Sequence, residues 1–226
     1  MGYRIADGYV YGVGNGNLYR INASGERTTV GSLGAMPSGY TGTFGDDGLL
    51  HVSSGGKNWY TIDVDTLETT SIPELSQGMG VADITNVSGV FYGVSSKGAL
   101  VRFDPTALTV ESLGNVDGLP TYSGAYGAAW STAGGNLYVG RNSGEIYQIT
   151  GYSTANPVAT QVGAAPSTNS NDGASCELAP PPPGLADVDG PAPETEPSTP
   201  EARAAAEQYA DGYEPTPIVI NDTTLY

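Results

Sequence analysis

The side chains that most often act as nucleophiles and bases are scarce in this chain, which has one histidine, His51, and one cysteine, Cys176. A serine or cysteine nucleophile needs a base beside it, and His51 is the only imidazole available. His51 stands where the equivalent segments of the sequence have tyrosine, so we interpret it as a packing residue. We interpret Cys176 as a small buried residue rather than a reactive thiol. The sequence therefore predicts no catalytic triad.

Metal-ligating residues are equally sparse. One histidine and one cysteine exclude a conventional zinc site, and the only short Asp-x-Asp runs are at residues 63–65 and 187–189. Asp63 is equivalent to Asn22 and Asp104, each directly after a strand-like run, where a side chain that accepts hydrogen bonds from turn N–H groups belongs. We therefore expect no cofactor. Calcium at a loop face or in a central channel stays an alternative that no residue set predicts.

Carboxylates are the remaining candidates for chemistry, because most glycosidases use a pair of them at one site. Asp83 is the most distinctive, since it lies in an expected inner strand whose equivalents are not acidic. The loop acids Asp46, Asp47 and Asp117 are weaker candidates. Asp83 is thus a candidate ligand-binding residue with two interpretations: the axial carboxylate of a carbohydrate-active enzyme, or an acid bonded to neighbouring backbone.

Aromatic side chains in expected loops are candidates for stacking on a ligand such as a sugar. Trp59 and Tyr122 are the strongest of these and are predicted as ligand-binding residues; Tyr40 also falls beside a loop. Trp130 and Tyr126 lie in a strand-like run, so we expect them in the core.

These residues are carried by a fourfold repeat of strands and turns. The repeats are YVYGVGNGNLYRINASGERTTVG from Tyr9, LLHVSSGGKNWYTIDVDTLETTS from Leu49, VFYGVSSKGALVRFDPTALTVES from Val90 and NLYVGRNSGEIYQIT from Asn136. Their equivalent positions are 41, 41 and 46 residues apart, which is the period of propeller blades. The sequence predicts an all-β fold: a β-propeller of four recognisable four-stranded blades, with a five-bladed ring as an alternative.

A further strand is expected before each repeat, at residues 1–5, 41–44, 81–84 and 128–130. The dipeptides between the strands, such as Asn15-Gly16, supply the positive φ angles that tight hairpins need. Residues 170–178 are predicted to form a late strand that pairs back with an early blade and closes the ring.

Three segments follow from this pattern: a propeller at residues 1–178, a Pro-rich acidic linker at 179–199 and a tail at 200–226. The linker has too few apolar residues to fold alone. The tail contains a short helical stretch at 200–208 and a β-capable end at 217–226. Either this end is frayed, or it adds as a strand to a sheet edge in this molecule or a neighbour. Its assembly candidates are Ile218, Val219, Ile220, Leu225 and Tyr226.

The net charge of −16 argues against nucleic acid and anionic lipid as partners. A single cysteine excludes an intrachain disulfide, and no apolar stretch approaches the roughly 18 residues of a membrane span. The opening residues MGYRIADG lack the basic and apolar regions of a signal peptide, so we expect either a chain without one or a trimmed start.

The amino-acid sequences of the repeats also resemble those of a known domain. The segments GYRIADGYVYGV, GVADITNVSGVFYGV, YGAAWSTAGGNLYVGRNSGEIYQIT and SNDGASC resemble a propeller domain of secreted or cell-surface proteins of Gram-positive bacteria, particularly actinobacteria. This resemblance covers about residues 2–178 and implies an extracellular or cell-surface location, a blade preceding Met1 and no established activity. It implies no catalytic residues.

The function expected from the sequence is therefore a non-enzymatic binding, adhesion or assembly module. Its expected partner is a protein or glycan on or near the cell surface. The alternatives are a subunit of a larger assembly that uses its C-terminal strand or open blade edge, and a carbohydrate-active enzyme with an axial carboxylate.

Overall fold

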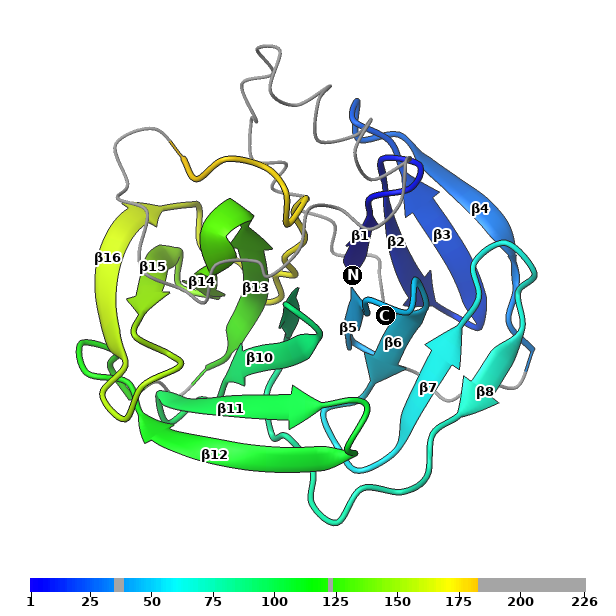
Figure 1. Cartoon of the computed structure of the whole chain (residues 1–226). Coiled ribbons are helices and arrows are strands. Elements are labelled where there is room, and N and C mark those ends of the chain that lie inside the picture. Colours follow the sequence, from blue (N-terminus) through cyan, green and yellow to red (C-terminus); the bar gives the residue numbers. More distant parts are fainter. Residues whose placement is uncertain (35–38, 122–123, 183–226) are drawn as a thin grey trace.

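A computed structural model describes residues 1–34, 39–121 and 124–182. In this part of the chain, sixteen strands form four antiparallel sheets of four strands each. The sheets are arranged around a central axis as the blades of a propeller (Figure 1), which confirms the predicted fold class. No helix among these residues is long and apolar enough to cross a membrane.

Each blade is a meander whose first strand lies nearest the axis. Blade 1 contains β1 (Gly2–Arg4), β2 (Tyr9–Gly14), β3 (Asn17–Ile21) and β4 (Arg27–Ser32). Blade 2 contains β5 (Thr41–Phe44), β6 (Leu50–Ser53), β7 (Trp59–Ile62) and β8 (Thr69–Ser71). Blade 3 contains β9 (Thr85–Val87), β10 (Val90–Val94), β11 (Ala99–Asp104) and β12 (Thr109–Asn115). Blade 4 contains β13 (Tyr126–Thr132), the short 3-10 turn Ala133–Gly135, β14 (Asn136–Arg141), β15 (Glu145–Thr150) and β16 (Val158–Ala164).

The turns between strands follow from their residues. Asn15 and Gly16 have φ angles of 49° and 72°, as a two-residue hairpin turn requires. Asp63 Oδ1 accepts hydrogen bonds from the main-chain N–H groups of Asp65, at 2.9 Å, and Thr66, at 3.2 Å. Asn22 and Asp104 accept the same type of bond in blades 1 and 3, which confirms their predicted role in turns.

Three apolar clusters join consecutive blades. Tyr11 packs edge-on against Phe44 between blades 1 and 2, with ring centroids 5.7 Å apart. Trp59 contacts Phe103 at 5.0 Å between blades 2 and 3. A third cluster, which includes Leu100, Tyr126 and Leu137, joins blades 3 and 4. Burial of these side chains is the main force that holds neighbouring blades together.

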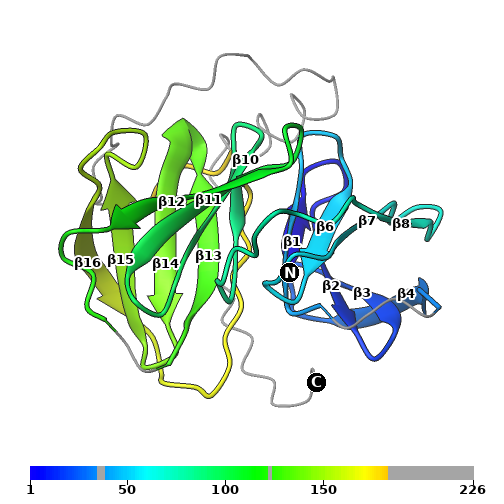
Figure 2. The ribbon, with the colours of Figure 1, turned by 90° about the horizontal axis from the view of Figure 1, so that it is seen from below.

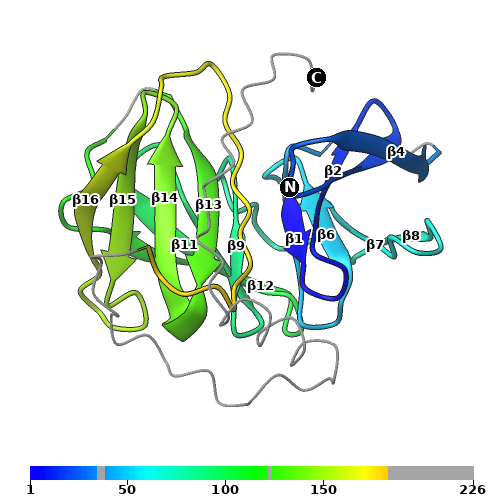
Figure 3. The same cartoon turned by 90° about the horizontal axis from the view of Figure 1, so that it is seen from above.

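The seam between blade 4 and blade 1 is built differently, because the three apolar clusters of the described residues do not include it. Here residues 171–179, which we call the closing segment, run along β13 and face β1 (Figures 2 and 3). The segment is held by polar contacts: the Met1 ammonium meets Asp172 at 2.8 Å, and the Ser175 hydroxyl donates to the carbonyl of Ser131.

Two strand predictions are wrong. The inner strand of blade 3 is Thr85–Val87 rather than 81–84, where Val81 makes only an isolated bridge with Ser95. The predicted closing strand at 170–178 lies in the expected place but is not a strand. The segment does not form a regular ladder of main-chain hydrogen bonds with a strand. Instead, the Gly173 N–H donates to the Asp83 carboxylate, and the Ser175 hydroxyl donates to the main-chain carbonyl of Ser131. The domain boundaries beyond residue 182 lie outside the described residues.

Candidate functional site

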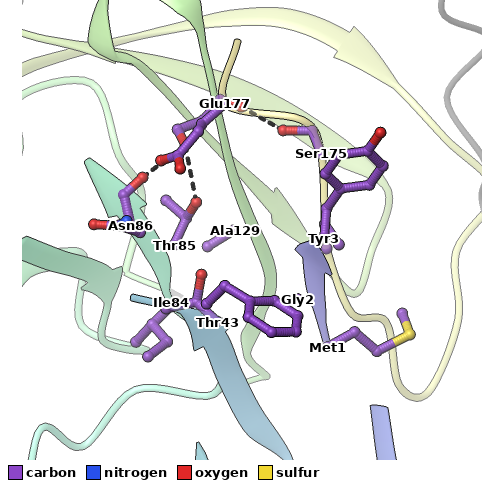
Figure 4. A pocket seen from close by; sticks show the side chains of 14 residues that line it. Met1, Gly2, Tyr3, Thr43, Ile84, Thr85, Asn86, Ala129, Ser175 and Glu177 are labelled. Carbon is purple, nitrogen blue, oxygen red and sulfur yellow. Dashed lines mark hydrogen bonds between the residues drawn. The ribbon is translucent and has the colours of Figure 1, made fainter. Parts of the chain in front are cut away.

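A pocket lies where the inner strands of all four blades meet the closing segment (Figure 4). The empty space within it is about 310 Å³, a figure that includes open solvent at its mouth. Polar residues from four elements line it: Thr43 from β5, Thr85 and Asn86 from β9, Ser131 from β13, and Ser175 and Glu177 from the closing segment. We call it the axial pocket.

Much of the pocket wall is fixed by a chain of hydrogen bonds. The Thr85 hydroxyl donates to Ser131 Oγ at 3.1 Å, and the Ser131 hydroxyl donates to the main-chain carbonyl of Asn86 at 2.7 Å. All three side chains are more than nine-tenths buried. Buried and satisfied groups of this kind give a site a rigid shape before any ligand arrives.

Two polar groups in the pocket remain unused. Within the described part of the chain, the Glu177 carboxylate and the Thr43 hydroxyl make no hydrogen bond to protein groups, and both stay accessible from the pocket. Burial raises the pKa of Glu177 to about 7, and the nearby charge of Asp46 adds to this effect. Asp46 itself accepts a hydrogen bond of 2.8 Å from Asn86 Nδ2. The pocket therefore holds a carboxyl group that changes its charge near neutral pH.

Asp83 lies beside the axis but does not line the pocket. Its side chain is only 1% exposed, and Oδ2 accepts hydrogen bonds from the main-chain N–H of Ala129 at 2.7 Å and of Gly173 at 3.0 Å. Burial raises its pKa well above the ordinary value, with a further rise from the charge of Asp172 and an opposing effect from the Met1 ammonium. In this geometry Asp83 links blades 3 and 4 to the closing segment, as in the second of its two interpretations.

The Met1 ammonium balances part of the axial negative charge. Burial lowers its pKa, but the charges of Asp172 and Asp83 outweigh burial, and the net result is a raised pKa. The ammonium therefore stays positive and attaches β1 to the closing segment through Asp172.

His51 and Cys176 occupy structural positions. His51 is buried, Nε2 lies 3.0 Å from an Asp47 carboxylate oxygen, and its ring packs against Phe91 at 5.0 Å. Neither residue lines the axial pocket. Cys176 is buried, and burial is the main cause of the raised pKa of its thiol. A thiol with a raised pKa is a poor nucleophile.

The predicted aromatic ligand site is not brought together. Trp59 is fully buried: it begins β7, and its indole packs against Phe103, so it has no free ring face for a ligand. Tyr122 lies outside the described residues. Tyr40 is 60% exposed, whereas Tyr126 is buried as expected. The assembly candidates at 218–226 also lie outside the described residues.

Sequence reasoning missed Glu177 and Thr43. Glu177 is the only acid within the segment GASCELA, flanked by small and apolar residues, and this isolation was the one available signal of burial. Thr43 carries no such signal, because threonine is common throughout the strands. Only the convergence of β5 with a segment more than a hundred residues later places the two in one pocket.

Comparison with solved structures finds chains with partial similarity. A catalytically inactive virginiamycin B lyase from Staphylococcus aureus with quinupristin has 17% sequence identity and a TM-score of 0.47, over 76% of this chain and 58% of that chain. A streptogramin B lyase has 17% identity and a TM-score of 0.46, over 74% of this chain and 55% of that chain. A mitotic checkpoint complex has 17% identity and a TM-score of 0.44, over 69% and 47%. The chain thus spans less than two thirds of these chains, and nothing about activity follows from the likeness.

No curated protein matches the chain. A family model described as a repeat of unknown function, DUF6923, matches residues 1–178, which include all four blades and most of the closing segment. The chain therefore belongs to the DUF6923 family of repeats of unknown function.

Proposed function

We propose that the protein is a non-enzymatic binding, adhesion or assembly module that works outside the cell or at its surface, and that the axial pocket is its binding site. The supporting observation is the combination found there: the unpaired Glu177 carboxylate and Thr43 hydroxyl stand in a rigid polar wall. The only imidazole, His51, is bonded to Asp47 and lies outside the pocket. Such a pocket can hold a ligand, and no imidazole lines it to activate a hydroxyl nucleophile.

The test measures binding and turnover on the same samples. Wild-type protein is incubated with a panel of glycans and purified cell-wall polymers, and both bound protein and released products are quantified. The module is expected to bind at least one polymer saturably and to release no product over time. Steady product release by the wild-type protein would contradict the proposal.

A carbohydrate-active enzyme is the second candidate function. One observation favours Glu177 over Asp83 as its catalytic carboxyl group. Asp83 is buried and occupied by backbone N–H groups, whereas Glu177 faces the pocket and has the pKa of about 7 that suits a general acid. If products are released, the variant E177Q should abolish their release, whereas D83N should retain it.

An assembly role is the third candidate, favoured by the polar seam between blades 4 and 1. In the described residues this seam has no apolar cluster and is joined by the polar contacts of the closing segment, which a strand from another chain could displace or extend. The sequence suggests residues 217–226 as such a strand. Deleting these residues should lower the sedimentation coefficient of any oligomer to that of the monomer, and an unchanged profile would remove this candidate.

A further inference from the structure

The axial pocket contains an acid for which the described part of the chain offers no counter-ion. No lysine, arginine or histidine lines the pocket beside Glu177. The one cation in its lining, the Met1 ammonium, already pairs with Asp172 at 2.8 Å. A mostly buried carboxylate without a partner is energetically costly. Binding a positively charged group would therefore stabilise the pocket.

Thr43 gives a second, independent indication of a ligand. Thr43 is only 7% exposed, and its hydroxyl makes no hydrogen bond to a protein group among the described residues. The hydroxyl oxygen is open to the pocket space, so its available partner is water or a ligand group from outside the chain. Figure 4 shows Thr43 and Glu177 reaching into the same space from different elements.

The charge around the pocket disfavours anions. Glu177 lies in the pocket wall, and Asp46 is near enough to raise its pKa further. Asp172 is a further carboxylate beside the pocket and offsets the charge of the Met1 ammonium, with which it pairs. A phosphate, sulfate or carboxylate ligand would be repelled from this region, and a cation would be attracted.

The available acceptors fit an organic ammonium better than a metal ion. Among the described residues there is no group of three or more His, Cys, Asp or Glu side chains that could hold a metal. A primary ammonium has three N–H donors and needs three acceptors around one point. The Glu177 carboxylate and the Thr43 hydroxyl supply two, and the hydroxyl oxygen of Thr85 or Ser175 keeps acceptor capacity for the third while it donates elsewhere.

We propose that the axial pocket binds a primary ammonium group, as carried by a lysine side chain or an amino sugar, with Glu177 as its ion-pair partner and Thr43 as a further acceptor. This inference rests on the proposed function and names the class of ligand that the module recognises. Both sources share the same headgroup, so the experiment decides between them.

The experiment is a nuclear magnetic resonance titration of the full chain at about pH 7.5, where Glu177 is mostly ionised and a large fraction of each probe amine is still protonated. The probes are Nα-acetyl-lysine amide and glucosamine. Their uncharged counterparts, in which the amine is acetylated, serve as controls, and calcium chloride tests for a metal. Amide signals of β5 and the closing segment should shift with at least one ammonium probe and with none of the other three compounds. The tighter of the two ammonium probes identifies the source.

Matched variants test the named residues. E177Q should weaken binding of the ammonium probe by about tenfold or more, and the isosteric T43V by a smaller factor of about three. E74Q, which neutralises an exposed acid, should bind as the wild type does. T43V keeps the test decisive if E177Q disturbs the fold, because it leaves the charge in place.

The inference would be overturned by no axial shift with either ammonium probe, or by unchanged affinity in both E177Q and T43V. A larger axial shift with calcium than with both amines would also overturn it in favour of a metal. Polymer binding that persists unchanged in E177Q would leave the proposed function standing while removing the ammonium site. Product release by the wild type would contradict the proposed non-enzymatic function and leave the ammonium site standing.

Discussion

Asp83 and Gly173 are 90 positions apart in the sequence, and a hydrogen bond of 3.0 Å from the Gly173 N–H to Asp83 Oδ2 joins them beside the propeller axis. The same carboxylate oxygen accepts the N–H of Ala129 at 2.7 Å. One buried acid therefore connects blade 3, blade 4 and the closing segment. This connection holds the closing segment, and with it Glu177, against the axial pocket.

The first prediction concerns this carboxylate. D83A should lower the free energy of unfolding by about 2–5 kcal/mol, because two buried N–H groups lose their acceptor. D83N keeps an acceptor oxygen of the same shape and should cost less than about 1 kcal/mol. Urea denaturation followed by tryptophan fluorescence measures both. Equal losses in the two variants would show that the hydrogen bonds are not what Asp83 contributes.

The second prediction concerns the close fit of the closing segment on β13. A Cβ atom added at Gly173 would lie 2.7 Å from the Ala129 nitrogen and 2.8 Å from its carbonyl oxygen, where rigid backbone cannot yield. G173A should therefore destabilise the protein by about 1–3 kcal/mol. G56A is the matched control, because a Cβ there meets nothing within 4 Å. Thermal unfolding of the two variants should differ; equal melting temperatures would mean that the segment is not docked as described.

The third prediction is a pH dependence of stability set by Glu177. Its pKa of about 7 in the folded state lies above the ordinary value of 4.5, so between these values the folded state binds more protons than the unfolded state. Stability must then fall as pH rises through this window, by about 3 kcal/mol at most. In E177Q this part of the fall should be missing, and the variant should be more stable than wild type at about pH 8.

Denaturant midpoints measured at several pH values test the pH dependence. E74Q is the control, because the Glu74 side chain is exposed and its neutralisation should leave the wild-type pH dependence unchanged. Parallel pH profiles for wild type and E177Q would contradict the raised pKa of Glu177.

The fourth prediction separates packing from ligand binding at Trp59. W59A should cost about 3–5 kcal/mol of stability, because the indole is fully buried against Phe103. Y40A removes an aromatic ring that is 60% exposed and should change stability by less than about 0.5 kcal/mol. If W59A retained wild-type stability and lost only polymer binding, the burial of Trp59 would be incorrect.

The blades were predictable because their signals are local. The period near 41 residues and the turn residues Asn22, Asp63 and Asp104 depend on neighbours within a few positions, and the structure confirms both. Trp59 was misplaced because an aromatic residue one position before a Tyr-x-Ile strand looks like a loop residue. The strand in fact begins at Trp59, and the ring enters the core between blades.

The axial pocket was not predictable, because its walls come from every blade. Thr43 and Glu177 have no spacing that links them, and the acid that did attract attention, Asp83, is used for closure. Burial and the absence of a partner define the site, and neither can be derived from residue type alone. The repeat pattern predicts the strands within each blade, but it does not predict long-range contacts of this kind between blades and the closing segment.

A direct measurement of the Glu177 pKa tests most plainly that an unpaired, mostly buried carboxylate faces the axial pocket. The carboxyl carbon of Glu177 is followed by carbon nuclear magnetic resonance through a pH titration, with its signal assigned by its loss in E177Q. A midpoint near 7 is predicted, and it should move down when an ammonium probe is bound. A midpoint near the ordinary value of 4.5 would contradict the described site.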